Sequence, residues 1–199
     1  MMAYEVEIKF LVADAKALAR RLRASGFRLV TRRTHEMNVL YDLPEHPLRQ
    51  RGEILRLRKY GDRWTLTHKS KGTARLHKSR QELETAVADG ASLDRILRAL
   101  GFSPSFRYEK FRSEWTDGHG HVVIDETPIG TVAEIEGRPR WIDRTARLLD
   151  VPRTSYITLS YVAMFDEWKR RTGSAAQEMT FAAIGGRRTG DRKKQIPRA

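Results

Sequence analysis

Charged and apolar residues alternate along nearly every strand-like segment of this sequence, and this alternation constrains the fold more than any other feature. In residues 4–10, Glu5, Glu7 and Lys9 alternate with apolar side chains. Because side chains two positions apart in a strand lie on the same face, these three charges share one face. The same pattern recurs along later segments and aligns Arg56, Arg58, Lys69, Arg80, Glu82, Glu84, Lys110, Arg112, Asp125, Glu134 and Glu136. The sequence therefore predicts an antiparallel sheet with one charged face.

The make-up of the charged face indicates whether it points to water or to an interior. An ordinary antiparallel sheet exposes its polar face to solvent, and for any single strand that is the simpler interpretation. Solvent-facing positions usually mix Ser, Thr, Gln and Lys, whereas here paired Arg and paired Glu residues dominate. We therefore expect a sheet closed into a barrel, with helices covering its apolar side and the charges lining a water-filled lumen.

An internal repeat supports this α+β arrangement. The segments LRASGF at 22–27 and LRALGF at 97–102 each close a predicted helix, and a Glu-x-Glu strand precedes each helix. Asp14 is the expected N-cap of the first helix and Ser92 that of the second. Further helices are expected over 141–150 and around 161–168, where Tyr161 is interpreted as core packing. Chance similarity of two amphipathic helix ends is the alternative to a pseudo-two-fold barrel of two similar halves.

Composition separates a folded domain from a basic extension. The chain has 199 residues and a net charge of +13. We expect a domain over residues 1–171 and an extension over 172–199, disordered from about residue 185, because the last fifteen residues are rich in Gly and basic side chains. The absence of a long apolar run predicts a cytoplasmic protein without a membrane span.

The charge balance implies a polyanionic partner, either a nucleic acid or a small phosphorylated substrate. Arg and Lys side chains in a lumen would grip the oxygens of a polyphosphate. Carboxylates beside it would repel it unless divalent cations lay between them. Since the chain has no cysteine, a metal must be held by carboxylates or histidines, which favours Mg²⁺ or Mn²⁺. Together the charges predict a metal–triphosphate site.

The motif Glu5-Val6-Glu7-Ile8-Lys9 resembles the N-terminal signature of the CYTH superfamily, the triphosphate tunnel metalloenzymes. The later elements LRLR at 55–58, LTHK at 66–69, RQELE at 80–84, KFR at 110–112, Asp125 and EIE at 134–136 follow in the order typical of that family. The resemblance covers roughly residues 4–165 and implies a closed eight-stranded antiparallel barrel that forms a tunnel, with helices packed outside.

The resemblance also implies roles for individual residues. The triphosphate would be bound by Lys9, Arg56, Arg58, Lys69, Arg80, Lys110 and Arg112. The metal would be bound by Glu5, Glu7, Asp125, Glu134 and Glu136, while Glu82 and Glu84 would line the tunnel. Tyr41 is expected near the reacting phosphate, and Lys69 or Lys110 is a candidate general base because neighbouring cations ease loss of its proton.

The reaction is open between two chemistries that need nearly the same electrostatics. In a cyclase the ribose hydroxyl attacks the α-phosphorus of ATP, whereas in a triphosphatase water attacks a terminal phosphorus. The stretch 38–59 is similar to the class IV adenylate cyclase group, and Ser155-Tyr156 resembles the Ser-Tyr motif near the cyclase C-terminus. We therefore rank a cyclase-like enzyme first and a triphosphatase acting on thiamine triphosphate, tripolyphosphate or a nucleotide second.

Two alternatives stay open at the level of the sequence. A basic RNA-binding or polyphosphate-binding module could use aromatics interleaved with basic residues, as in 107–115, but such a binder has no use for a set of aligned carboxylates. Nucleic acid is therefore not the expected partner. A homodimer is possible. The histidines are expected to be peripheral, with His119 and His121 in a hairpin turn and His68 facing away from the tunnel.

Overall fold

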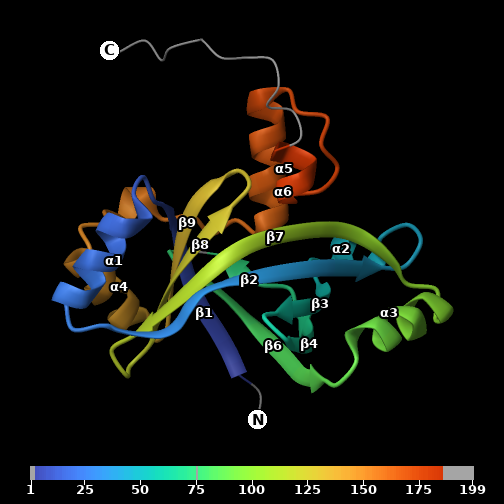
Figure 1. Cartoon of the computed structure of the whole chain (residues 1–199), viewed down its shortest axis with the longest axis horizontal. Helices are drawn as coiled ribbons and strands as arrows, with labels where there is room; N and C mark the ends of the chain where they lie inside the picture. Colours follow the sequence, from blue (N-terminus) through green and yellow to red (C-terminus); the bar gives the residue numbers. More distant parts are fainter. Residues whose placement is uncertain (1–2, 75, 186–199) are drawn as a thin grey trace.

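The computed structural model describes residues 3–74 and 76–185, and their strands form one antiparallel barrel (Figure 1). The barrel strands are β1 (Ala3–Leu11), β2 (Arg28–Asp42), β3 (Ile54–Tyr60), β4 (Arg63–Lys69), β6 (Lys78–Val87), β7 (Ser103–Thr116), β8 (His121–Thr127) and β9 (Gly130–Glu136). The helices are α1 (Ala15–Ala24), α2 (Pro47–Arg51), α3 (Gly90–Ala99), α4 (Pro139–Leu148), α5 (Tyr161–Thr172) and α6 (Phe181–Gly185). The two-residue strand β5 (Thr73–Ala74) pairs antiparallel with the start of β6 and is not part of the ring.

The strands close into a ring in the order β1, β9, β8, β7, β2, β3, β4, β6 and back to β1. Every pairing in this ring is antiparallel, and the β1–β6 pairing that closes it places Glu5 opposite Arg80. The expected closed eight-stranded barrel is confirmed.

The two halves of the barrel are related as the internal repeat predicts. Strands β1 to β4 with α1 correspond to β6 to β9 with α3, and exchanging these sets leaves the ring order unchanged. Both helices are capped by an aspartate, Asp14 or Asp89, whose side chain accepts two backbone N–H groups of the first turn. Each ends at a glycine with positive φ, Gly26 or Gly101, as a left-handed C-terminal turn requires. The prediction of Ser92 as the second N-cap is wrong, because Asp89 caps α3.

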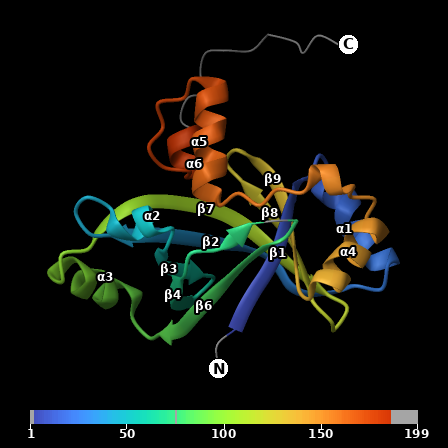
Figure 2. The same ribbon diagram turned by 180° about the vertical axis from the view of Figure 1, so that it is seen from behind.

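Helices cover the apolar outer face, as expected. Side chains of α1 and α4 pack together on the outside of β1, β7, β8 and β9, where Leu22, Trp141 and Ile142 are buried (Figure 2). On the other half, Leu97 of α3 packs with Val39 and Leu57. Apolar burial therefore lies outside the barrel, which leaves its lumen to polar side chains.

Helix α5 covers one end of the barrel and stands above the strands in Figure 1. At this end the inward-facing side chains are apolar, because Leu40, Tyr108 and Val132 pack against Tyr161 and Phe165 of α5. Helix α5 thus belongs to the same folded body as the strands.

The segment after α5 also folds onto the barrel. Met179 is fully buried and exchanges backbone hydrogen bonds with Arg107 and Glu109 of β7. Residues 173–185 are thus structurally continuous with the domain that we expected to end at residue 171. The expectation of disorder beyond about residue 185 falls almost entirely on residues 186–199, which lie outside the described residues.

Strand β2 is one continuous strand of 15 residues. Its pairing with β7 shifts register near Thr31, which bends the strand. The bend falls in the stretch 31–36, where polar residues interrupt the apolar pattern of the strand. Among the helices in the described ranges, none has the length and apolar character needed to cross a membrane.

Candidate functional site

The charged faces of the strands meet around a cavity of about 710 Å³ inside the barrel. The cavity is lined by nearly all of the site residues expected from the sequence: Glu5, Glu7, Lys9, Arg56, Arg58, Lys69, Arg80, Glu82, Glu84, Lys110, Arg112, Glu134 and Glu136. Strand alternation explains this convergence, since each strand presents every second side chain to the lumen.

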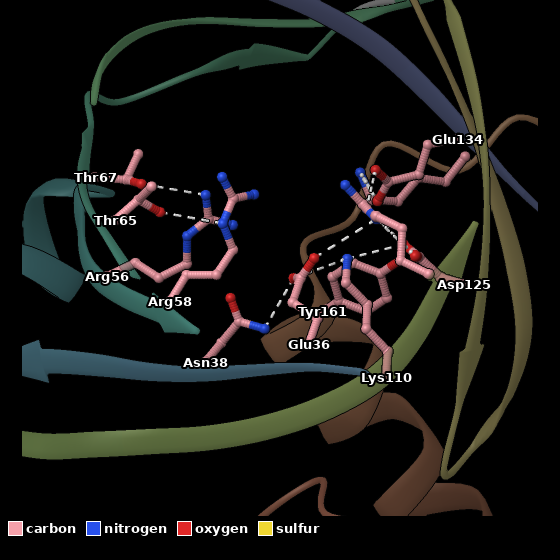
Figure 3. A network of polar contacts seen from close by, with 12 residues as sticks. Glu36, Asn38, Arg56, Arg58, Thr65, Thr67, Lys110, Asp125, Glu134 and Tyr161 are labelled. Carbon is pink, nitrogen blue, oxygen red and sulfur yellow. Dashed lines mark hydrogen bonds and ion pairs between the residues drawn. The ribbon is translucent and has the colours of Figure 1, made fainter. Parts of the chain in front are cut away.

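One wall of the cavity carries arginines from β3. The Arg58 guanidinium donates two hydrogen bonds to the Glu84 carboxylate at 3.0 and 3.1 Å. Arg56 donates one to the Thr67 hydroxyl at 3.3 Å (Figure 3). Thr67 in turn donates to Glu84 at 2.7 Å. The two guanidinium groups are therefore held in place and directed across the lumen.

Lys69 continues this wall from β4. Its Nζ lies 2.8 Å from Glu5 and 2.7 Å from Glu82, and Glu5 also accepts a bond from the Arg80 Nε at 3.3 Å. Although burial alone would raise it, the pKa of Glu5 is lowered to about 2 by the neighbouring Lys69 and Arg80. Glu5 is thus a permanent carboxylate at neutral pH.

The opposite wall is built from β7 and β8. Lys110 Nζ donates to Asp125 at 2.9 Å, and Arg112 donates two bonds to Asp125, at 2.7 and 2.6 Å, and one to Glu134 at 2.8 Å. Glu36 of β2 lies 3.4 Å from Lys110 Nζ. These cations face Arg56 and Arg58 across the lumen (Figure 3).

Strands β1 and β9 join the two walls with a row of glutamates. In the strand register Glu7 lies opposite Glu136, and Lys9 lies opposite Glu134. Lys9 Nζ contacts Glu7 at 2.5 Å and Glu134 at 3.1 Å, whereas Glu136 has no such cation contact within the described part of the chain. Enclosure by the barrel and the charges of the neighbouring glutamates, Glu5 first among them, raise the pKa of Glu136 to about 7.

The glutamate row offers the oxygen donors of a divalent-cation site, but these donors are not yet arranged around one point. In the described ranges, no three carboxylate or histidine side chains already surround one point, because Glu5, Glu7 and Glu134 are turned toward lysines and arginines. The buried Glu7 Oε1, however, has no hydrogen-bond partner among the described residues, and burial together with the charges of neighbouring glutamates raises the pKa of Glu136. Two hard oxygen donors on adjacent strands fit Mg²⁺ or Mn²⁺, so the residues present are compatible with the expected metal.

Two of the expected site residues do not line the cavity. Tyr41 is buried among Val39, Leu57 and Leu97 outside the barrel, and its hydroxyl donates to Asp94 of α3. The prediction that Tyr41 lies near the reacting phosphate is therefore wrong. Asp125 faces inward, but it is fully buried behind Lys110 and Arg112.

The Ser-Tyr pair that the resemblance singled out, Ser155-Tyr156, also lies away from the cavity. Ser155 lies at the end of a short 3-10 helix and Tyr156 directly follows it, and neither residue lines the cavity. The second Ser-Tyr pair, Ser160-Tyr161, does line it, at the start of α5. Interpreting Tyr161 as core packing alone was thus incomplete. The histidine expectations differ in outcome: His68 is half exposed beside Glu53, away from the cavity, whereas His121 begins β8 and lines the cavity rim.

Several inward-facing residues were missed. Lys78 of β6 lines the cavity, 3.7 Å from Glu7, and burial together with Lys9 and Arg80 lowers its pKa to about 8. Glu36 and Asn38 of β2 are fully buried on the inward face and hydrogen-bonded to each other. The alternation 78, 80, 82, 84 could have revealed Lys78. Positions 36 and 38 carry only one charged side chain between them, so the sequence gave little indication that this face of β2 points inward.

Comparisons with known proteins agree with this geometry. The CYTH domain family matches residues 3–139. A candidate adenylate cyclase of Methanocaldococcus jannaschii is 25% identical over 133 residues, which cover 66% of this chain and 75% of that protein. The solved structure of a candidate adenylate cyclase from Vibrio parahaemolyticus superposes with a TM-score of 0.74 at 20% identity, over 83% of this chain and 99% of that one. A candidate adenylyl cyclase from Hippeastrum superposes with a TM-score of 0.59 at 20% identity, over 82% and 95% of the chains. At this identity the structural likenesses show a shared fold.

Proposed function

The chain belongs to the CYTH domain family, and on that premise we propose that it binds an organic triphosphate in the barrel cavity and cleaves a phosphoanhydride bond with a divalent metal ion. The observation that carries this proposal is the convergence of arginines, lysines and glutamates from all parts of the barrel around one cavity of about 710 Å³. A cavity lined mainly by charged side chains is suited to a compact polyanion.

In this proposal the phosphates lie between the two cationic walls. Arg56 and Arg58 bind phosphate oxygens in the planar, bidentate manner of guanidinium groups, and Lys69 and Lys110 act as point charges. Each of these cations now contacts a carboxylate, so an incoming triphosphate would replace Glu84, Glu5 and Asp125 as their partner. Cations held in place before the substrate arrives lose little freedom when they stabilise the charge of the leaving phosphate.

The proposed metal ligands are Glu7, Glu134 and Glu136, with Glu5 beside them. The bound cation would supply neutralisation of phosphate charge during cleavage. When phosphates take over the contacts of Lys9 and Arg112, the Glu7 and Glu134 carboxylates become available as ligands. We therefore expect metal and triphosphate to bind cooperatively.

We infer that Lys78 is the strongest candidate for the proton acceptor. Lys69 and Lys110, the candidates from the sequence, each contact two carboxylates. Lys78 lines the same cavity and, among the described residues, contacts a single carboxylate, Glu7, at 3.7 Å; burial first of all lowers its pKa to about 8. An amine with a pKa near the working pH can both lose and accept a proton.

The apolar patch at the covered end of the cavity favours an organic triphosphate. Leu40, Ile54, Tyr108 and Val162 line this end beside the charged walls. A nucleotide could place its base against these side chains and its phosphates between the cations. We therefore rank a class IV adenylate cyclase-like reaction, ATP to cyclic AMP and pyrophosphate, first.

A triphosphatase is the second candidate. The related candidate cyclase from Hippeastrum is described as having a dominant triphosphatase activity. Because the two reactions use the same cations and metal, a small change in how the substrate lies would exchange the attacking group.

Incubation with ATP, thiamine triphosphate or tripolyphosphate, each with Mg²⁺ or Mn²⁺, tests the proposal. We expect cyclic AMP with pyrophosphate for a cyclase and orthophosphate for a triphosphatase. Arg56→Ala should abolish either product, whereas Arg63→Ala, on the exposed end of β4, should not. No product from any substrate, or equal activity in both variants, would contradict the proposal.

A further inference from the structure

The first turn of α5 forms part of the cavity wall. Ser160, Tyr161 and Val162 line the cavity, and the Tyr161 hydroxyl donates a hydrogen bond to Asp125 Oδ2 at 2.5 Å (Figure 3). Because α5 follows the last barrel strand, this bond connects the C-terminal part of the chain to the cationic wall of β7 and β8.

Asp125 organises that wall. It is fully buried, and its two oxygens accept bonds from Lys110 and Arg112 as well as from Tyr161. One oxygen, Oδ2, is shared by Lys110 Nζ at 2.9 Å, Arg112 Nη2 at 2.6 Å and the Tyr161 hydroxyl. With all its contacts made to protein donors, Asp125 is placed to orient cations, which is a different position from the metal ligand that the sequence suggested.

The Tyr161 ring contacts the same cations. Lys110 Nζ lies 4.6 Å from the ring centroid and Lys9 Nζ lies 5.8 Å from it, within the range of cation–π attraction. The other aromatic side chains of α5, Phe165 and Trp168, stack on each other and belong to the apolar cluster. Tyr161 is thus the aromatic side chain of α5 whose ring and hydroxyl both contact the charged network.

We propose that Tyr161 is a positioning residue that sets how strongly Lys110 and Arg112 bind phosphate, by sharing the Asp125 carboxylate with them. A carboxylate that accepts a bond from a neutral hydroxyl attracts its cationic partners less strongly. Without that hydroxyl, Asp125 would hold Lys110 and Arg112 more strongly, and the two cations would bind phosphate less strongly. The proposal rests on the proposed function, since it assumes that these cations receive phosphate.

Tyr161→Phe isolates the hydroxyl, because phenylalanine keeps the ring and its packing. The matched control is Tyr156→Phe, which removes a hydroxyl from the same C-terminal segment outside the cavity. The probe is inorganic tripolyphosphate, whose binding is measured by calorimetry with EDTA present so that no metal contributes. We expect about tenfold weaker binding for Tyr161→Phe and a change of less than about twofold for the control, with similar melting temperatures.

Equal tripolyphosphate affinity in wild type and Tyr161→Phe would overturn the proposal and leave the proposed function intact. If the wild-type protein binds neither tripolyphosphate nor ATP, whether with EDTA or with Mg²⁺ present, the proposed function fails, and a second measurement decides the positioning role. The NMR signal of the Lys110 side chain then moves in Tyr161→Phe if the hydroxyl positions this lysine. An unmoved signal would overturn the coupling itself.

Discussion

Glu136 lies in a row of glutamates, and its burial together with the charges of these neighbours predicts that stability depends on pH. Its pKa is raised from 4.5 to about 7 in the folded protein. The folded state therefore binds the Glu136 proton more tightly than the unfolded chain does, so its stabilising effect is present below about pH 4.5 and is lost as the pH rises through about 7.

We expect the free energy of unfolding, measured with urea in metal-free buffer, to fall from pH 5 to pH 8 more steeply in wild type than in Glu136→Gln. Glu167→Gln, on the exposed part of α5, should behave as wild type. Parallel curves for wild type and Glu136→Gln would show that Glu136 titrates as an ordinary carboxyl.

Lys78 predicts a pH dependence of a different kind. If it accepts the proton of the attacking hydroxyl or water, kcat should rise with pH around the lowered pKa of about 8. Lys78→Met should lower kcat by at least about a hundredfold and remove this rising limb, since general-base catalysis typically contributes this much. The control Lys59→Met lies on the outward face of β3, where Lys59 contacts Trp64. A rising limb preserved in Lys78→Met would assign the base elsewhere.

Single residues also show where sequence reasoning was sufficient. Glu5, Glu7 and Lys9 could be placed in the lumen because strand alternation fixes the face of every second residue. Tyr41 could not be placed in this way. In strand β2 its side chain lies on the face opposite to that of Glu36 and Asn38, so it points out of the barrel. The sequence did not show which face of β2 points inward, because Asn38 and Leu40 on that face carry no charge.

The equivalent helices α1 and α3 have equivalent N-caps, and we expect these caps to contribute equally to the free energy of unfolding. Asp14 and Asp89 each accept two backbone N–H groups at the start of their helix. Replacing either by Ala should lower the free energy of unfolding by about 1 kcal/mol, and replacing it by Ser should preserve most of that energy. Urea denaturation measures both effects, and an Ala variant as stable as its Ser counterpart would contradict a capping role.

Element boundaries were predicted less well than element types. A helix with Ser92 as its N-cap was expected, whereas α3 begins at Gly90 and Asp89 caps it. Asp and Ser are both frequent N-cap residues, so the sequence alone did not distinguish them. Strand β2 continues through the polar stretch 31–36 because it pairs there with the long β7.

At the scale of the whole molecule, the sequence predicted that the strands close into a barrel, but not that α5 covers one end of it. Closure agrees with the repeat, because the two similar halves pair with each other through β1–β6, β1–β9, β2–β7 and β4–β6, which leaves no barrel strand with a free edge. The packing of α5 and Met179 on the barrel depends on contacts distant in sequence, which no local pattern encodes. Apolar residues at 161–168 predicted a helix but not its partner.

Met179 provides a measure of how far the C-terminal segment stabilises the barrel. Its side chain is 0% exposed, and Met179→Ala should cost about 2 to 5 kcal/mol of unfolding free energy, as other buried Met-to-Ala changes do. Leu148→Ala is the control, because Leu148 is 51% exposed. If thermal or urea unfolding finds the two variants equally stable, the segment after α5 is not part of the cooperative unit.

Removal of the basic extension distinguishes a triphosphate-cleaving enzyme from a nucleic-acid binder. Residues 186–199 carry six basic side chains and one acidic one, whereas all cavity residues lie between 5 and 162. A chain ending at residue 185 should therefore keep its turnover of triphosphate within about twofold, since the charges that contact the substrate are unchanged. Any binding of the full chain to random-sequence RNA, measured by fluorescence anisotropy at low salt, should weaken sharply in the shortened chain and lose its steep salt dependence. If the shortened chain keeps both its affinity for RNA and that salt dependence, a polyanion-binding surface must lie on the folded domain, and the cavity would not be the sole explanation for its positive charge.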